Sequence, residues 1–283
     1  MKLRKSLTLF TTLATTFVLS ACTTLSFYAA NTKNDLSEVD VQKNIKYGKG
    51  ARQRYDVYVP KVEPLKGSVI FFYGGGWRQG EKNQYTFVAD RLTSMGYEVF
   101  IPDYTLYPEQ EFPHFIEDSA AAVAHITRKN PDKKFVLMGH SAGAYNAAML
   151  LADKKYLQQQ DATSENIQAF IGLAGPYDFI PTSKKYQLIF QSIKSPKEMH
   201  VSTFIDGTEP TFFLYHGAED GTVSPFYSHR LAKTIQKRGG QVYMEELSDI
   251  NHINIMSSFS ERFRTDLPEK MFGKITSFMN APK

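Results

Sequence analysis

The stretch Lys134-Phe-Val-Leu-Met-Gly-His-Ser-Ala-Gly-Ala-Tyr-Asn-Ala-Ala-Met-Leu-Leu151 decides the fold of this chain. Its apolar beginning predicts a strand, and its alanine-rich end predicts a helix. Between them lies a G-x-S-x-G pentapeptide, typical of a strained turn that exposes a nucleophilic serine, here Ser141, above a sheet. The alternative is an ordinary strand-to-helix turn in which Ser141 only caps the helix.

Strands and helices alternate along the rest of the chain. Continuous apolar runs suit strands that are buried on both faces of a parallel sheet. We therefore predict an α/β fold, with an open, mostly parallel central sheet and helices on both faces. Ligands of such sheets bind beyond the carboxyl ends of the strands, where the motifs described below lie. The predicted strands are 55–59, 68–73, 97–101, 134–138, 169–174, 211–215 and 241–245, and the predicted helices are 85–94, 116–129, 142–151, 225–238 and 267–279.

A serine nucleophile needs a base within hydrogen-bond reach, and the base needs a third group to hold it. Of the seven histidines, His252 is the candidate base because it lies in the loop after the last predicted strand. Asp220, in the loop after the preceding strand, is the candidate acid, with Glu219 and Asp249 as rivals. Without this context, His252 is a surface-loop histidine and Asp220 a turn residue before a glycine. The order Ser141, Asp220, His252 is that of the α/β-hydrolases.

Backbone donors for the oxyanion of a tetrahedral intermediate are predicted at two places. The amide of Ala142 directly follows the serine. The segment Gly74-Gly-Gly-Trp77 follows a predicted strand and resembles the HGGG motif of the hormone-sensitive-lipase-like esterases, which implies Gly75 and Gly76 as donors. Tyr73 stands where that family has histidine, so the hydrogen bonds that anchor this loop must differ. The alternative is a flexible glycine turn.

Further motifs extend this resemblance from about residue 47 to the end of the chain. Ile101-Pro-Asp-Tyr104, Gly175-Pro-Tyr-Asp178 and the segment 216–223 resemble the esterase/lipase branch of the α/β-hydrolases, including its feruloyl-esterase-like and kynurenine-formamidase-like carboxylesterases. The resemblance implies the α/β-hydrolase fold, and we expect no large cap domain. Thr105 lacks the charge that usually follows this Asp-Tyr pair, so we interpret Asp103 as scaffolding.

The substrate pocket is less well defined by the sequence. Trp77 lies beside the glycine loop, Tyr145 beside the elbow and Tyr177 at a strand end. Each of the three either lines the pocket or belongs to the core. The apolar residues of the segment 177–209 either cover the site or pack as an ordinary surface helix.

The beginning of the chain resembles a bacterial lipoprotein signal. Lys2, Arg4 and Lys5 precede a short apolar stretch, and Leu19-Ser-Ala-Cys22 resembles a lipobox. Cys22 is the only cysteine, which excludes an intramolecular disulfide. Lipid chains on Cys22 anchor a protein stably to a membrane. The alternative is an ordinary cleavage site with an incidental cysteine.

The organisation predicted from these features has three parts. Residues 1–21 are a signal peptide, 22–40 a lipidated cysteine followed by a flexible tether, and 41–283 the catalytic domain. The residue after Cys22 is threonine rather than aspartate, which resembles sorting to the outer membrane, facing the periplasm.

Charge and composition exclude several other functions. The chain is formally +4, and the three cations before Cys22 supply most of that charge. The sequence has no basic patch with interleaved aromatic residues, so we do not predict nucleic-acid binding. It also has no metal-ligand cluster and no cofactor motif. We predict a membrane-anchored serine carboxylesterase that hydrolyses short-chain or aryl esters. The alternatives are an arylformamidase or peptidase of the same fold, and a non-catalytic binding lipoprotein.

Overall fold

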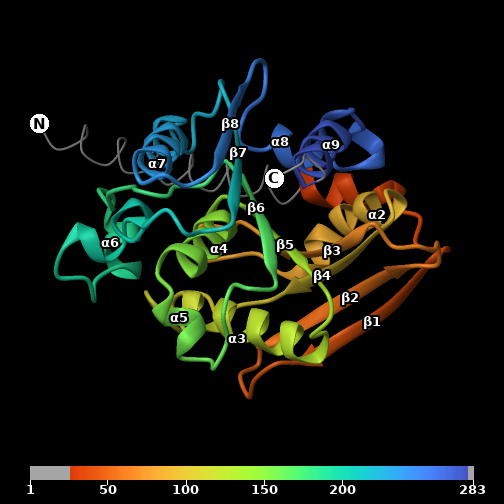
Figure 1. Ribbon diagram of the computed structural model, residues 1–283, viewed down its shortest axis with the longest axis horizontal. Coiled ribbons are helices and arrows are strands. Elements are labelled where there is room, and N and C mark those ends of the chain that lie inside the picture. Colours follow the sequence, from red (N-terminus) through yellow and green to blue (C-terminus); the bar gives the residue numbers. More distant parts are fainter. Residues whose placement is uncertain (1–25, 280–283) are drawn as a thin grey trace, which may run out of the picture.

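A single mixed sheet of eight strands organises the computed structural model, which describes residues 26–279 (Figure 1). The strand order is β1-β2-β4-β3-β5-β6-β7-β8; β1, β2 and β4 pair antiparallel, and every other pair is parallel. The predicted mostly parallel sheet is therefore confirmed. The strands are β1 (Val39–Lys46), β2 (Arg54–Pro60), β3 (Gly67–Phe72), β4 (Tyr97–Pro102), β5 (Phe135–His140), β6 (Ile167–Leu173), β7 (Thr211–Gly217) and β8 (Val242–Leu247).

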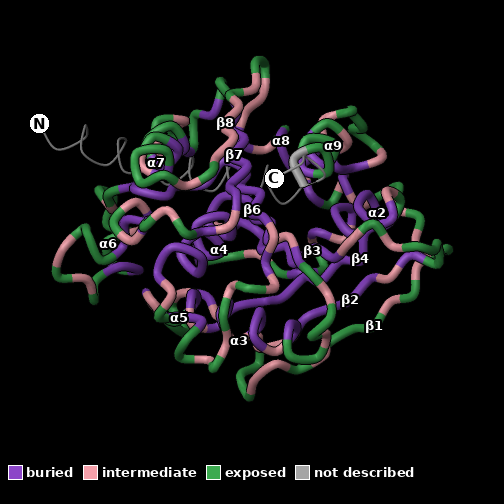
Figure 2. Tube along the Cα trace, in the orientation of Figure 1, coloured by how far each residue is buried: buried purple, intermediate pink, exposed green. Residues whose placement is uncertain are grey.

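The central strands are buried on both faces, as their continuous apolar runs predicted. Every residue of β4 and β7 is buried, whereas every residue of β1 is exposed or half-buried (Figure 2). The sequence analysis missed β1, because an edge strand that contacts the sheet along one side only needs no continuous apolar run.

Helices cover both faces of the sheet. On one face α2 packs near the C-terminal α9, and on the other α3 and α4 lie together with α7 (Figure 1). Between β6 and β7 the chain forms only α6 and two short 3₁₀ turns, so no cap domain is inserted there. The α-helices are α2 (Thr86–Ser94), α3 (His114–Lys129), α4 (Ala142–Ala152), α5 (Lys155–Gln158), α6 (Lys184–Ile189), α7 (Phe226–Lys237), α8 (Asn254–Ser257) and α9 (Leu267–Met279).

The remaining turns are of the 3₁₀ type, namely η1 (Asn31–Lys33), η2 (Lys82–Tyr85), η3 (Pro196–Glu198), η4 (Val201–Thr203) and η5 (Glu261–Phe263). No helix within residues 26–279 combines the length and the apolar character that crossing a bilayer requires.

The chain joins the folded domain earlier than predicted. Residues 26–30 are helical, and Phe27 is buried against the rings of Tyr85 and Phe87. The Asn31 amide donates to the carbonyl of Gln84 at 2.8 Å. The predicted flexible tether over 22–40 is therefore wrong for this part, because its apolar side chains find a hydrophobic surface on the domain. Residues 1–21 and Cys22 lie outside the described residues.

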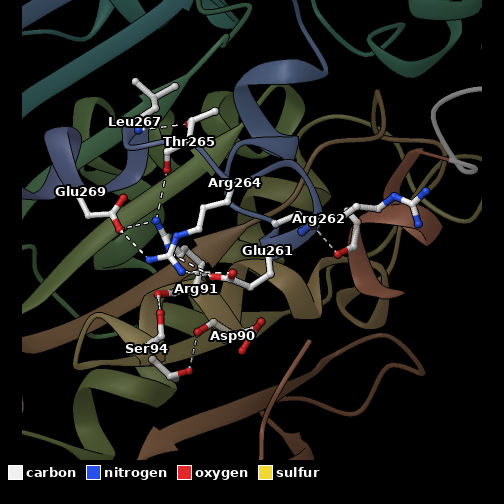
Figure 3. Close-up of polar contacts among 12 residues, drawn as sticks. Asp90, Arg91, Ser94, Glu261, Arg262, Arg264, Thr265, Leu267 and Glu269 are labelled. Atoms are coloured by element: carbon white, nitrogen blue, oxygen red, sulfur yellow. Dashed lines mark hydrogen bonds and ion pairs between the residues drawn. The ribbon is translucent and has the colours of Figure 1, made fainter. Parts of the chain in front are cut away.

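A buried arginine holds the last described helix, α9, on the domain. Arg91 on α2 is enclosed between Glu261 on η5 and Glu269 on α9, and its guanidinium also donates to the Thr265 carbonyl (Figure 3). A buried charge is tolerated only when opposite charges and hydrogen bonds surround it. This cluster therefore orients α9 after the loop that carries His252.

Candidate active site

Ser141 occupies the sharp turn between β5 and α4. Its backbone has φ 54° and ψ −121°, a left-handed conformation that is strained for any residue other than glycine. A Cβ on Gly143 would lie 2.1 Å from the carbonyl oxygen of Phe72, so only glycine lets α4 approach β3 this closely. The predicted elbow is present, and a capping role for Ser141 is not, since its side chain caps no helix amide.

The predicted base and acid meet Ser141 in a continuous hydrogen-bonded relay. Nε2 of His252 lies 3.0 Å from Oγ of Ser141, and Nδ1 lies 2.7 Å from Oδ2 of Asp220. A carboxylate only accepts, so Nδ1 carries the proton and Nε2 is free to accept the serine proton. The rivals Glu219 and Asp249 are exposed and stand outside the relay.

Asp220 is held from several directions. Its Oδ1 accepts the amides of Thr222 and Val223, each at 2.8 Å. Burial works to raise the pKa of Asp220, but hydrogen bonds from His216 and His252 outweigh it and hold the pKa below its ordinary value. Asp220 therefore stays ionised, as a group that stabilises an imidazolium must.

A second histidine contacts the same carboxylate. Nε2 of His216, at the end of β7, lies 3.1 Å from Oδ2 of Asp220 and 2.9 Å from the carbonyl of Val223. Both neighbours are acceptors, so Nε2 is protonated. Its Nδ1 lies 2.7 Å from Oγ of Ser228 on α7. His216 is completely buried and holds the same carboxylate oxygen that His252 contacts.

His140, the residue before the serine, supports the base through its backbone. Its Nε2 donates to the carbonyl of His252 at 3.0 Å. Burial and the charge that His252 acquires hold the pKa of His140 well below its usual value. A neutral His140 therefore positions the His252 loop without competing for the proton.

The glycine loop faces Ser141 from the other side. A Cβ on Gly74 would stand 3.0 Å from Cβ of Ser141, so the loop lies directly against the nucleophile residue. Gly75 has φ 135°, and a Cβ there would lie 1.9 Å from the Gln79 carbonyl oxygen. Within residues 26–279 the amides of Gly75 and Gly76 donate to no protein acceptor. The amide of Ala142 opens α4, where no helical acceptor exists.

Tyr73 replaces the expected histidine with a different anchor. Its hydroxyl donates to Oδ1 of Asp103 at 2.7 Å and accepts from the guanidinium of Arg52 at 2.8 Å. Arg52 also donates to the carbonyls of Tyr104 and Gly80. Asp103 is therefore scaffolding, as interpreted from the sequence, and Arg52 supplies the charge that Thr105 lacks.

The three predicted pocket residues belong to the core. Trp77, Tyr145 and Tyr177 are each no more than 2% exposed. Trp77 stacks on Phe179 and donates from Nε1 to Asn146, and the Tyr145 hydroxyl donates to the carbonyl of Met199. The sequence left open whether these three residues line the pocket or belong to the core, and in the structure they belong to the core. Partly exposed Tyr186, which packs edge-on against Trp77, is the aromatic residue nearer the surface.

Metal ligands are not grouped in the part of the chain that the structure describes. Across residues 26–279, no three His, Cys, Asp or Glu side chains cluster in a way that could hold an ion.

A serine at the elbow after β5, with its acid in the loop after β7 and its base in the loop after β8 of an eight-stranded sheet, defines the α/β-hydrolase fold. The BD-FAE family matches residues 55–235, more than half of the chain, and the chain belongs to that family.

The chain is also similar to individual proteins, two of which are a methylesterase and a formamidase. A probable isoprenylcysteine alpha-carbonyl methylesterase of Arabidopsis thaliana is 26% identical over 235 residues, which are 71% of this chain and 48% of that protein. A kynurenine formamidase of Salmo salar is 27% identical over 245 residues and 82% of each chain. This chain thus spans about half the length of the methylesterase it matches, and it is a homologue of carboxylic ester hydrolases.

Solved structures share the fold. Esterase B from Lactobacillus rhamnosis, inhibited by a C4-C4 tributyrin phosphonate, has a TM-score of 0.79 at 18% identity, covering 95% of this chain and 94% of that chain. A hormone-sensitive lipase from a metagenome library has a TM-score of 0.71 at 14% identity, over 90% of this chain and 88% of that chain.

Proposed function

We propose that this protein is a serine carboxylesterase that hydrolyses short-chain or aryl esters. The observation that carries the proposal is the hydrogen-bonded relay from Ser141 through His252 to Asp220. The distance from Oγ of Ser141 to Nε2 of His252 is 3.0 Å, and that from Nδ1 of His252 to Oδ2 of Asp220 is 2.7 Å. Such a relay is the arrangement that activates a serine hydroxyl toward a carbonyl carbon. Membership of the BD-FAE family and relatives named as esterases support the ester as the bond attacked.

Each group has one role in the proposed reaction. Oγ of Ser141 attacks the ester carbonyl while Nε2 of His252 takes its proton. The tetrahedral oxyanion accepts hydrogen bonds from the amides of Gly75, Gly76 and Ala142. His252 then protonates the departing alcohol, which leaves an acyl group on Ser141. Water, deprotonated by His252, releases the acid and restores the serine.

An aryl formamide is the second candidate substrate. The kynurenine formamidase relatives are matched over most of their length, 82% in Salmo salar and 88% in Danio rerio. The same relay and oxyanion donors serve an amide, because both reactions pass through an acyl-enzyme. The two functions differ in leaving group, so turnover on matched substrates separates them.

The test uses residues 23–283 with p-nitrophenyl esters of increasing chain length, an aryl formamide and an active-site phosphonate. We expect the phosphonate to label Ser141 and turnover to be best on short esters. Ser141→Ala should lower kcat by about a thousandfold or more while circular dichroism and thermal unfolding stay like wild type.

The acid provides a matched pair of variants. Asp220→Asn should lower kcat by about a thousandfold because the amide favours the wrong tautomer of His252, whereas Glu219→Gln, one position earlier and exposed, should behave like wild type. Equal effects of the two changes, or no labelling and no turnover on any substrate, would favour a non-catalytic binding role.

We also propose that a lipid on Cys22 anchors the enzyme to the outer membrane, facing the periplasm. The basic start, the apolar stretch and the Leu19-Ser-Ala-Cys22 segment support this. Because residues 26–30 pack on the domain, the four residue-to-residue steps from Cys22 to Ser26 span at most about 14 Å, which supports a position of the domain close to the lipid. Cys22→Ser should move the protein from the membrane to the soluble fraction; retention in the membrane would contradict the anchor.

A further inference from the structure

Two cations stand beside the glycine loop without a carboxylate partner. Arg78 follows the loop directly, its amide bound to the Gly75 carbonyl at 3.2 Å, and Lys185 lies on α6. Both side chains are exposed, and within residues 26–279 neither forms an ion pair. By contrast, Arg230 is paired with Asp178 at 3.1 Å, and Lys154 with Asp206.

Tyr186 joins these cations to the site. Nζ of Lys185 lies 5.0 Å from the centre of the Tyr186 ring, and the Tyr186 hydroxyl stands 3.2 Å from the point where a Cβ on Gly76 would lie. The ring is fixed by edge-on packing against Trp77 and Phe179. The hydroxyl forms no hydrogen bond with any described residue. A donor next to Gly76 is therefore available to a substrate whose carbonyl oxygen rests on that loop.

The charges of this group act on one another. Although much of its side chain is exposed, partial desolvation of Lys185, followed by the like charge of Arg78, lowers the pKa of its ammonium group. Burial raises the pKa of Tyr186, and Arg78 opposes that change. Arg78 and Lys185 repel each other and have no carboxylate partner among the described residues. An anion bound between them would therefore offset this repulsion and stabilise both charges.

We propose that Arg78, Lys185 and Tyr186 bind an anionic group carried by the substrate, so that the enzyme favours carboxylate-bearing esters over neutral esters of the same shape. This rests on the proposed esterase activity and specifies its substrate class. Arg78 offers a planar fork of donors, Lys185 a mobile point charge and Tyr186 a fixed hydroxyl. The anionic group is on the acyl arm or on the alcohol arm of the ester.

The experiment compares matched esters on the purified full-length chain. The acyl arm is probed with mono-4-nitrophenyl glutarate against 4-nitrophenyl pentanoate, and the alcohol arm with 3-carboxyphenyl acetate against phenyl acetate. The readout is the ratio of kcat/KM for the anionic ester to that for the neutral ester, after subtraction of spontaneous hydrolysis. Each variant's ratio is divided by the wild-type ratio, which cancels the intrinsic reactivity of the esters.

We expect Lys185→Ala and Arg78→Ala each to lower the ratio about two- to fivefold for one of the two ester pairs. Lys185→Glu should lower it further, and Tyr186→Phe should lower it while keeping the ring packing. Lys184→Glu makes the same charge change one residue earlier on α6, at an exposed side chain, and should leave the ratio at the wild-type value. High salt should reduce the wild-type ratio but not that of the double variant Arg78→Ala/Lys185→Ala.

The outcomes separate this proposal from the esterase proposal. Turnover of neutral and anionic esters with the same ratio in wild type, Lys185→Glu and the double variant would overturn the anion site and leave the esterase intact. An equal drop of the kcat/KM ratio for Lys184→Glu would also overturn the anion site, because the overall positive charge of this surface would then explain the preference. No turnover on any ester would overturn both.

Discussion

The two sides of Ser141 differ in how their hydrogen-bonding groups are held. On the acid–base side, the supporting carboxylate is itself saturated with hydrogen bonds: Asp220 accepts from two amides and two histidines. On the proposed oxyanion side, the amides of Gly75 and Gly76 donate to no acceptor within residues 26–279, and the support comes from side chains beneath the loop. The difference follows from chemistry, because the acid must hold one geometry throughout the reaction, whereas oxyanion donors must keep their hydrogens free for a charge that forms only transiently.

The support of the proposed oxyanion side is a side-chain network rather than the loop itself. Buried Tyr73 and Asp103 and half-buried Arg52 bind one another, and Arg52 also binds the carbonyl of Gly80, which holds the backbone without occupying the amides of Gly75 and Gly76. The comparison thus predicts that the oxyanion side is sensitive to any added atom, and the acid–base side to any removed hydrogen bond.

Among the variants that alter the support of the site rather than Ser141 or Asp220 themselves, the largest effect is expected from Gly75→Ala. The new Cβ would lie 1.9 Å from the carbonyl oxygen of Gln79 at φ 135°, so the loop must move and the oxyanion donors with it. We expect kcat to fall by about a hundred- to a thousandfold, measured by steady-state hydrolysis of a short p-nitrophenyl ester.

Gly221 provides the control on the acid–base side. It directly follows Asp220, yet a Cβ there meets nothing within 4 Å, so Gly221→Ala should keep near-wild-type kcat. A Gly75→Ala enzyme with normal kcat would show that the loop is not an oxyanion site.

A smaller effect is expected from His216→Phe, which removes one charge-assisted hydrogen bond to Asp220 and keeps the ring volume. We expect kcat to fall about tenfold, with partial recovery in His216→Gln, whose amide nitrogen can reach the position of Nε2. Equal kcat in the two variants would mean that His216 only fills space.

The pH dependence of stability sharpens this prediction. The lowered pKa of Asp220 stabilises the fold above the unfolded-state pKa of about 3.9, and this contribution is lost as pH falls through the folded-state value. The gap in unfolding free energy between wild type and His216→Phe should therefore be widest near neutral pH and narrow below about pH 4. Urea unfolding at several pH values measures it.

The smallest effect on catalysis is expected from Tyr73→Phe. Loss of the hydroxyl leaves Asp103 and Arg52 each one partner short, which should cost about 1–3 kcal/mol of unfolding free energy and reduce kcat less than His216→Phe does. Tyr215→Phe is the control, since its buried hydroxyl has no hydrogen-bond partner among the described residues. If the Tyr73→Phe protein were as stable as the Tyr215→Phe protein, the network of Tyr73, Arg52 and Asp103 would not support the loop.

The strand ends were predictable because their signals are local. The elbow, the His216–Val223 loop and His252 each follow an apolar run, and parallel strands bring their carboxyl ends to one edge. Edge strand β1 was missed, since a strand exposed on its outer side carries a weak pattern. The helical segment 26–30 was missed for a related reason: its apolar residues acquire meaning only against Tyr85 and Phe87.

By itself, the sequence determined the order Ser141, Asp220, His252 and the glycine loop that faces them, because turns and strand ends are encoded by neighbouring residues. Only the tertiary structure decided which polar atoms hold those groups: Arg52 for Tyr73, His216 for Asp220 and His140 for the backbone of His252. It also decided that Trp77, Tyr145 and Tyr177 are core residues. Side chains brought together from distant positions carry no local pattern, and an aromatic residue reads the same in sequence whether it faces a substrate or the core.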